Sequence, residues 1–299
     1  MQRKYLLTTQ SDPNDRLPRY RPTIGQAAIY DSHDREVNFR DMFVGYSCFL
    51  LCGGPSLART DLDPLRERGM LTMAVNNAAS VFKPNLWTHM DAPGRFLENN
   101  WLDATVMKFS MFSHHWANIR QRDRETGELL LSDLTVEQLP NTWFYHADEY
   151  FDPNTYLTSH AFSCGCKDGA TDSLGNVGSR SVMLIALKLL YVLGVRTVYL
   201  VGCDFRMQHA TDGHTAQNYA FPQNRAPSTI DANNRAYSTL NSRLSALRPK
   251  FEDVGYNVFN CTPNSGLEAF DRVPYEVAVK SASKVCNELP IITEGYYDT

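Results

Sequence analysis

The chain has 299 residues, of which 43% are hydrophobic and 21% charged, and its formal net charge is −4. These proportions are typical of a folded globular protein with room for one large domain or two closely joined ones, and they disfavour a general nucleic-acid-binding surface, which is basic. The sequence contains no run of about 18 apolar residues, the length that spans a bilayer, and its basic N-terminus has no apolar signal-peptide core. We therefore expect a cytoplasmic protein.

The first 42 residues are polar, contain proline and have little periodicity. We expect residues 1–42 to be an N-terminal extension that wraps the core or meets a partner. We then expect residues 43–299 to form one folded domain.

Short apolar segments alternate with helical patterns through this domain. The segments typical of buried strands are Tyr46–Cys52, Leu71–Asn76, Leu86–Met90, Thr105–Phe109, Thr142–His146, Thr197–Val201 and Asn257–Asn260. The helical patterns are Asp61–Arg68, Ser179–Leu193 and Ile230–Leu247. This alternation predicts an α/β, Rossmann-like fold, with a mostly parallel sheet and helices on both faces.

Three segments do not fit the alternation. Residues Gln121–Glu128 read as a charged loop or an exposed helix, and residues 151–178 as irregular structure. The stretch at about 206–228 is too rich in Gly, Pro, Asn and Gln to be a core element, so we expect a mobile lid there.

The first candidate site is the loop Gly53-Gly54-Pro55-Ser56, which follows the first strand. Glycine lets a backbone approach a phosphate and adopt a positive φ, and a following helix supplies unpaired N–H groups and a positive dipole end. Ser56 offers a hydroxyl or a helix cap. The loop therefore predicts a phosphate site, with an ordinary strand–helix turn as the alternative.

Polar residues also follow three later strands, and ligands of parallel sheets bind beyond the carboxyl ends of strands. Asn76 offers a donor and an acceptor for a ribose or a base edge, or it makes a turn. Asp91 suits a metal, a ribose or an acceptor hydroxyl, or it caps a helix. The last group comprises Asp204, Arg206, His209, His214 and Tyr219. A histidine there suits a general base, and exposed loop histidines are the alternative.

The cysteines carry a weaker signal. They are seven in number, and four of them lie in or beside apolar segments: Cys48, Cys52, Cys203 and Cys261. Buried free thiols explain them better than a disulfide framework does. His160 with Cys164 and Cys166 lacks the spacing typical of structural zinc.

A further segment, Phe112–Trp116, suits either an acceptor surface or partly buried aromatic packing.

The order of these motifs resembles the bacterial CMP-sialic-acid-dependent sialyltransferases. Those enzymes carry GNGPSL, a strand ending in Asn, an apolar helix ending in LG, IYLSGIDF, a YAF segment and a late PNS-x-L-x-x-F. This chain carries CGGPSL, a strand ending in Asn, TVYLVGCDF, YAF and NCTPNSGLEAF in the same order over about residues 46–275. It is also similar to the group of motility-associated flagellin glycosyltransferases and 6-hydroxymethylpterin pyrophosphokinases, which share the GPSL loop.

The resemblance implies roles for individual residues. Tyr219 corresponds to a tyrosine that neutralises the leaving phosphate. The residues that it places at the nucleotide are Gly53, Gly54, Pro55, Ser56, Asn76, Ser179 or Ser181, Asp204, Asn264 and Ser265. Two departures stand out. Arg206 replaces a tyrosine, and the catalytic histidine that the family has after YAF is absent.

These observations predict a glycosyltransferase that uses a nucleotide-activated sugar, with a CMP-sugar-like donor and an acceptor hydroxyl. Tyr219 and Arg206 would stabilise the departing phosphate, and His214, His209 or Asp91 would take the proton of the acceptor. No cofactor or metal is required by this resemblance.

The alternatives are a Mg²⁺-dependent pyrophosphoryl or nucleotidyl transferase and an inactive nucleotide-binding module. The acceptor stays open between a glycan, a protein and a nucleic-acid base, and so does a homo-oligomer.

Overall fold

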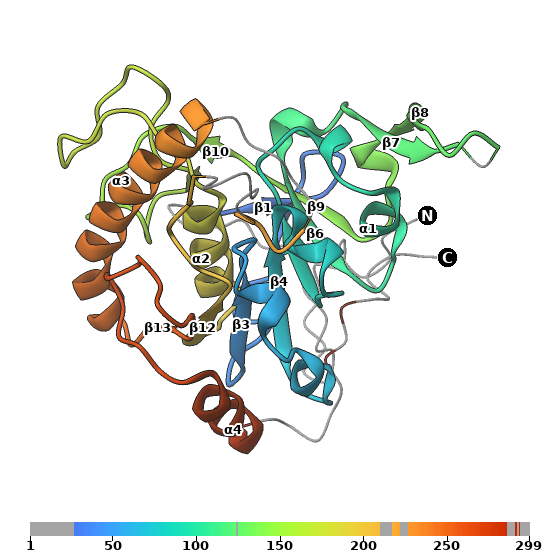
Figure 1. The fold of residues 1–299 in the computed structure, drawn as a ribbon. Helices are drawn as coiled ribbons and strands as arrows, with labels where there is room; N and C mark the ends of the chain where they lie inside the picture. Colours follow the sequence, from blue (N-terminus) through green and yellow to red (C-terminus); the bar gives the residue numbers. More distant parts are fainter. Residues whose placement is uncertain are drawn as a thin grey trace.

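A nine-stranded sheet lies at the centre of the computed structural model, which describes residues 27–123, 125–209, 217–221, 227–285, 291 and 293 (Figure 1). The strand order is β13-β12-β3-β4-β5-β6-β9-β1-β2. From β13 to β9 all neighbours are parallel, and β1 and β2 add an antiparallel edge. The parallel strands are β3 (Ser47–Leu51), β4 (Leu71–Val75), β5 (Leu86–Thr88), β6 (Met107–Met111), β9 (Thr142–Tyr145), β12 (Thr197–Val201) and β13 (Asn257–Asn260).

Each strand that the sequence predicts is present. The central strands are apolar runs buried on both faces of the sheet, whereas the edge strand β13 leaves Asn257 exposed. The largest shift is in β6, which begins at Met107 instead of Thr105. The carboxylate of Asp103 accepts hydrogen bonds from the amide and the hydroxyl of Thr105, at 2.9 and 2.6 Å. These side-chain hydrogen bonds compete with the backbone hydrogen bonds of the sheet, so β6 begins only at Met107.

Helices cover both faces, as the sequence predicts. On one face, Cys48 and Leu50 of β3 share a core with α2 (Val182–Val192) and α3 (Pro227–Glu252). On the other face, Phe49 and Leu51 share a core with α1 (Glu98–Leu102) and α4 (Tyr275–Val285). The helix α2 lies between the sheet and α3 (Figure 1), so nearly its whole circumference is buried and not only the single stripe that its sequence predicts.

One predicted element is wrong. The helix expected over Asp61–Arg68 is replaced by two short 3₁₀ turns, Leu57–Arg59 and Asp63–Arg66, because the backbone is extended at Thr60 and Glu67.

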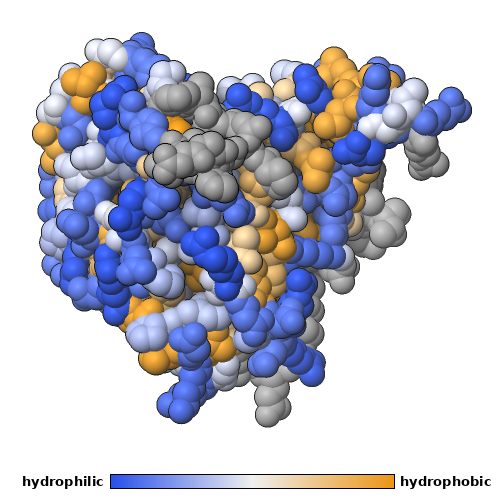
Figure 2. Space-filling model, viewed as in Figure 1, coloured by the Kyte–Doolittle hydropathy of each residue, from blue (hydrophilic) through white to orange (hydrophobic). Residues whose placement is uncertain are grey.

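The segment Gln121–Glu128, expected as a charged loop or an exposed helix, is mostly loop, since its described residues after Arg122 connect two strands. It belongs to a hairpin of β7 (Asn118–Arg122) and β8 (Leu129–Thr135), which projects from the body of the molecule (Figure 1). The exposed leucines of β8 add to the apolar surface there (Figure 2).

Residues 27–39, which the sequence assigns to the N-terminal extension, pack into the core. They form β1 (Ile29–Tyr30) and β2 (Glu36–Val37), and the buried ring of Phe39 lies 4.6 Å from that of Trp143. Residues 1–26 lie outside the described residues, so the predicted boundary at residue 43 stays a prediction. Among the described helices, none is long and apolar enough to cross a membrane. A further pair of short strands lies outside the main sheet: β10 (Ala147–Asp148) precedes the segment 151–178, and β11 (Phe162–Ser163) lies within it.

Candidate functional site

The direction of chain progression reverses between β3 and β12. The chain runs from β3 outward to β9 and then returns to β12 on the other side of β3. Ligands of open α/β sheets bind at such a switch point, beyond the carboxyl ends of the strands. A cavity of about 460 Å³ opens there. The sequence-predicted site residues that line it are Gly53, Gly54, Pro55, Asn76, Asp91, Ser179, Ser181, Asp204, Arg206 and Tyr219.

The loops that follow β3 and β12 cross in direct contact at the floor of the cavity. The amide of Gly54 donates to the carbonyl of Gly202 at 2.9 Å. Ser56 donates to Oδ2 of Asp204 twice, from its amide at 3.2 Å and from its hydroxyl at 2.7 Å. The two loops therefore hold each other in place.

This contact corrects the expectation that the loop cradles a phosphate with its amides. The amides of Gly54 and Ser56 already have acceptors, Pro55 has no amide hydrogen, and the 3₁₀ turn behind them is too short for a strong dipole. Neither Gly53 nor Gly54 has a positive φ. Among the described residues, Gly53 is the member of the loop whose amide hydrogen has no acceptor.

Position 54 requires glycine for a different physical reason, which is the close approach of the loop that follows β12. A Cβ on Gly54 would overlap the carboxylate of Asp204 and lie 2.5 Å from the carbonyl oxygen of Gly202. Gly202 has a φ of +75°, and a Cβ there would overlap the carbonyl of Cys52. Glycine at both positions is what lets the two loops cross.

Asn76 and Asp91 extend the wall beyond β4 and β5. Asn76 has a φ of +48°, and its Oδ1 accepts the amide hydrogen of Met90 at 3.1 Å, which joins the ends of the two strands. Asp91 is partly exposed and pairs with Arg95 at 3.4 Å. Both residues line the cavity beyond the carboxyl ends of the strands, where the sequence predicts a ligand site.

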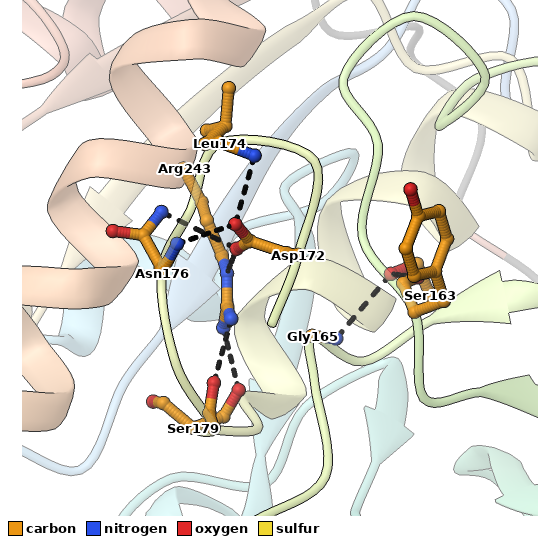
Figure 3. Close-up of polar contacts among 9 residues, drawn as sticks. Ser163, Gly165, Asp172, Leu174, Asn176, Ser179 and Arg243 are labelled. Carbon is orange, nitrogen blue, oxygen red and sulfur yellow. Dashed lines mark hydrogen bonds and ion pairs between the residues drawn. The ribbon is translucent and has the colours of Figure 1, made fainter. Parts of the chain in front are cut away.

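Ser179 and Ser181 also line the cavity, on the segment that enters α2. Ser181 caps the helix, since its hydroxyl accepts the amide hydrogen of Met183 at 3.2 Å. Ser179 has a φ of +66°. Its carbonyl accepts a hydrogen bond of 2.6 Å from Arg243, which reaches across from α3 (Figure 3).

Arg243 is fully buried and holds this segment in position. Its Nε lies 2.7 Å from Oδ2 of Asp172, and its other nitrogens donate to the carbonyls of Gly178 and Ser179 (Figure 3). Burial alone would raise the pKa of Asp172, but the hydrogen bond and charge of Arg243, with backbone amides of the loop, hold that pKa below its ordinary value. The pair is therefore ionised at neutral pH.

Arginines give the cavity an excess of positive charge that the sequence motifs indicate only in part. Arg95, Arg180 and Arg206 line it, against the carboxylates of Asp91 and Asp204. Arg180 also pairs with Glu149 at 2.8 Å. The signal for Arg180 was its position between two predicted site serines. Guanidinium groups in a cleft favour a phosphate-bearing ligand.

Aromatic rings line another part of the cavity. The rings of Tyr219 and Phe221 stack at 5.2 Å, and those of Phe205 and Tyr237 at 5.1 Å. Burial raises the pKa of Tyr237, so its hydroxyl stays protonated at neutral pH. Phe205 has a φ of +51°, which is uncommon for a bulky residue and which the crossing of loops at this site sustains.

Several predicted site residues do not reach this cavity. His209 is exposed and lies 2.8 Å from Asp231 on α3, while His214 lies outside the described residues. Ser265 is buried, and its hydroxyl donates to the carbonyl of Cys203. Asn264 lines a neighbouring cavity, in which Ser56 also lies. The lid predicted for about 206–228 falls largely on residues outside those that the structure describes and stays a prediction.

The weaker sequence signals have structural explanations. Cys164 and Cys166 are buried, and His160 bonds the hydroxyl of Tyr30 at 2.6 Å. In Phe112–Trp116, the ring of Phe112 stacks on those of His115 and His146, in agreement with the packing alternative. Each of the six cysteines within the described residues is a buried free thiol.

His89 follows β5, within the segment Leu86–Met90 that the sequence predicts as a buried strand, and it is fully buried. It bonds Ser110 at 3.0 Å, and burial lowers its pKa to about 3, so it stays neutral.

No protein-family model matches the chain, and no curated protein matches it in sequence. Among solved structures, it is similar to one described as a MAf glycosyltransferase from Magnetospirillum magneticum AMB-1. The alignment has 14% sequence identity and a TM-score of 0.39, and it covers 87% of this chain and 39% of that one. This chain thus spans well under half of that protein, and a likeness of this size carries no argument about function.

Proposed function

We propose that the chain is a glycosyltransferase that takes a nucleotide-activated sugar, of the CMP-sugar type, and transfers the sugar to an acceptor hydroxyl. The observation that carries the proposal is that one cavity at the switch point is lined by residues from five segments of the chain that the sequence motifs had singled out. Its arginines suit phosphate and its stacked aromatic rings suit a flat base or a sugar face.

Two sets of lining residues would bind the two parts of the donor. Asn76 and the Ser179–Ser181 segment present amide and hydroxyl groups to the nucleoside, in a cavity that opens over the crossing loops. Arg180 and Arg206 present guanidinium groups to the phosphate. Arg206 is fixed by a hydrogen bond to the carbonyl of Asn264. A guanidinium has five N–H donors, so one such bond leaves others for the ligand.

The chemical step requires charge stabilisation at the phosphate and a base at the acceptor. The acceptor oxygen attacks the anomeric carbon, and the bond from that carbon to the phosphate oxygen breaks with its electrons leaving on the phosphate. Arg206 and Tyr219 stabilise this growing negative charge. Asp91 is the described carboxylate placed to take the acceptor proton, since His209 lies outside the cavity. His214 remains a second candidate.

The test is a thermal-unfolding screen with CMP, CDP, UDP, GDP and ATP. A nucleotide at about 100 times its Kd should stabilise the folded protein by about 2.7 kcal/mol. We expect the cytidine nucleotides to raise Tm, and Arg180→Ala or Asn76→Ala to reduce that rise. Arg40→Ala is the matched control, because Arg40 is exposed and outside the cavity. Absence of any nucleotide response would refute the proposal.

A second candidate, Mg²⁺-dependent pyrophosphoryl transfer, is favoured by one observation: the carboxylates of Asp91 and Asp204 line the same cavity. Such enzymes typically bind Mg²⁺ through one or two carboxylates together with the phosphates of the substrate. Release of CMP from a CMP-sugar in EDTA supports the glycosyltransferase. A response to ATP alone, lost in EDTA and restored by Mg²⁺, supports the second candidate. Nucleotide binding without turnover supports an inactive module.

A further inference from the structure

A second cavity, also of about 460 Å³, lies on the other side of the loop that follows β3. It shares Pro55, Asp204, Arg206 and Asn218 with the first cavity. The two spaces therefore meet along this set of residues. The proposed donor site does not use the second space, although Ser56 and Asn264, which the resemblance assigns to the nucleotide, line it.

The charge of this cavity is positive on balance. Arg59, the last residue of the 3₁₀ turn after the glycine loop, is exposed and lines it together with Arg206. Among the described residues, no carboxylate pairs with Arg59. The carboxylate in the lining is that of Asp204, and its Oδ2 accepts two hydrogen bonds from Ser56. Two guanidinium groups thus outnumber one carboxylate that is already engaged.

Apart from Pro55 and Pro263, the rest of the lining is polar, and hydrogen bonds hold part of it in place. Asn218 accepts the amide hydrogen of Gln208 at 2.7 Å and donates to its carbonyl at 2.9 Å, which fixes these two residues against each other. Asn264 has a φ of +52°, and its carbonyl accepts a hydrogen bond from Arg206. Amide side chains around guanidinium groups provide further N–H donors for an anion.

We propose that the second cavity binds an anionic group, a phosphate or a carboxylate, of a second ligand while the first cavity holds the nucleotide. Arg59 belongs to the second site alone, and Arg206 serves both. The identity of that ligand as the acceptor rests on the proposed function; the anion site itself does not. The acceptor is then an anionic molecule whose charged group is bound beside Arg59, with its hydroxyl directed to the shared boundary.

An alternative carrier of this anionic group is the donor itself, through a group distant from its nucleotide. A charged group on the sugar of a complete donor would compete with the anion, whereas CMP, which lacks the sugar, would not. Inorganic phosphate is therefore titrated calorimetrically into the whole chain, alone, with saturating CMP and with a saturating CMP-sugar that carries a carboxylate. Phosphate that the CMP-sugar displaces but CMP does not would assign the cavity to the donor and overturn the proposal. We expect the CMP complex to bind one phosphate. Loss of phosphate binding in the presence of CMP would overturn the proposal, since one site would then hold both.

Variants assign the phosphate to its cavity. Arg59→Gln should weaken phosphate binding to the CMP complex about tenfold or more, the effect of losing a charged hydrogen bond. Arg180→Gln, in the first cavity, and Arg40→Gln, on the surface, should leave it within about twofold. Because Arg59 is exposed, its replacement should not unfold the chain, and Tm checks this.

Two outcomes separate this proposal from the proposed function. Wild-type phosphate affinity in Arg59→Gln overturns the second site, whatever CMP does. If CMP fails to bind while phosphate binding still depends on Arg59, the proposed function fails and the anion site stands.

Discussion

Ser56 donates both its amide hydrogen and its hydroxyl hydrogen to one carboxylate oxygen of Asp204, at 3.2 and 2.7 Å. Ser56 follows β3 and Asp204 follows β12, the two strands at which the chain reverses its direction across the sheet. Hydrogen bonds to a charged acceptor are stronger than neutral ones. This pair therefore fixes the floor of the cavity.

The crossing of the loops predicts a sharp difference between two adjacent glycines. In Gly54→Ala, the new methyl group would meet the carboxylate of Asp204 and the backbone of Gly202. Backbone cannot move aside as a flexible side chain can, so we expect a loss of about 3 kcal/mol in the free energy of unfolding, measured by urea denaturation. Any nucleotide-induced rise in Tm should vanish as well.

Gly53→Ala is the matched control in the same loop. A Cβ there would lie 3.2 Å from the ring of Phe221, a side chain that can shift by a few tenths of an ångström. We expect a change of less than about 1 kcal/mol. Equal losses for the two alanine variants would contradict the argument from close approach.

The sequence predicts the sheet well because its signal is local. A strand such as Leu71–Val75 is buried on both faces and therefore reads as an unbroken apolar run. Ligands bind beyond the carboxyl ends of parallel strands, so the order of strands and polar residues along the chain is enough to place Asn76 and Asp204 at one edge. Both do line the cavity.

The remaining features of the site depend on contacts that no local pattern records. The engagement of the Ser56 amide by Asp204 joins residues 148 positions apart. That contact is why a loop that reads as a phosphate cradle has most of its amide hydrogens occupied. Similarly, Arg243 reads as an ordinary polar residue of a helix, and only tertiary packing places it behind Ser179.

The buried pair of Arg243 and Asp172 should be costly to break. Arg243→Met leaves an uncompensated carboxylate and two unsatisfied carbonyls in the interior. Removing one partner of a buried ion pair typically costs about 3–5 kcal/mol. We expect a loss of that size in urea denaturation, together with weaker nucleotide binding, because the segment that contains Ser179 loses its support.

Arg248 provides a control on the same helix. It pairs with Glu252 and Asp271 at 2.8 Å, but its side chain is 37% exposed. Exposed ion pairs contribute up to about 1 kcal/mol, so Arg248→Met should be mild. A loss for Arg248→Met that matches the loss for Arg243→Met would show that burial is not the cause.

The thiols should be unreactive in the folded protein. Burial raises the pKa of Cys261 to about 12 and that of Cys164 to about 11, and it raises the pKa of Cys203, whose sulfur lies 3.2 Å from that of Cys52. At pH 8, roughly one Cys261 thiol in 10⁴ is then a thiolate, the reactive form. Iodoacetamide labelling, mapped by mass spectrometry, should therefore be slow at these positions and rapid in denaturant. Rapid labelling in the native protein would contradict the described burial.

Because Lys188 is buried, we expect the free energy of unfolding to rise at alkaline pH. Its ammonium is buried in α2 and donates to Ser159 and Ala161 at 2.7–2.8 Å, yet burial lowers its pKa to about 7. The unfolded chain keeps the proton up to a pKa of about 10.4 and therefore binds more protons than the folded chain between these values. Stability must then increase with pH across this window and stay flat below it.

Comparison with Lys188→Met isolates this contribution from other titrating groups. Between about pH 7 and 10, the wild-type free energy of unfolding should rise relative to that of the variant by up to about 1.4 kcal/mol per pH unit. Lys280→Met, on the exposed side of α4, should follow the wild type at every pH. The same slope in all three proteins would mean that Lys188 keeps its proton in the folded state, and its three hydrogen bonds would then outweigh the desolvation of the ammonium.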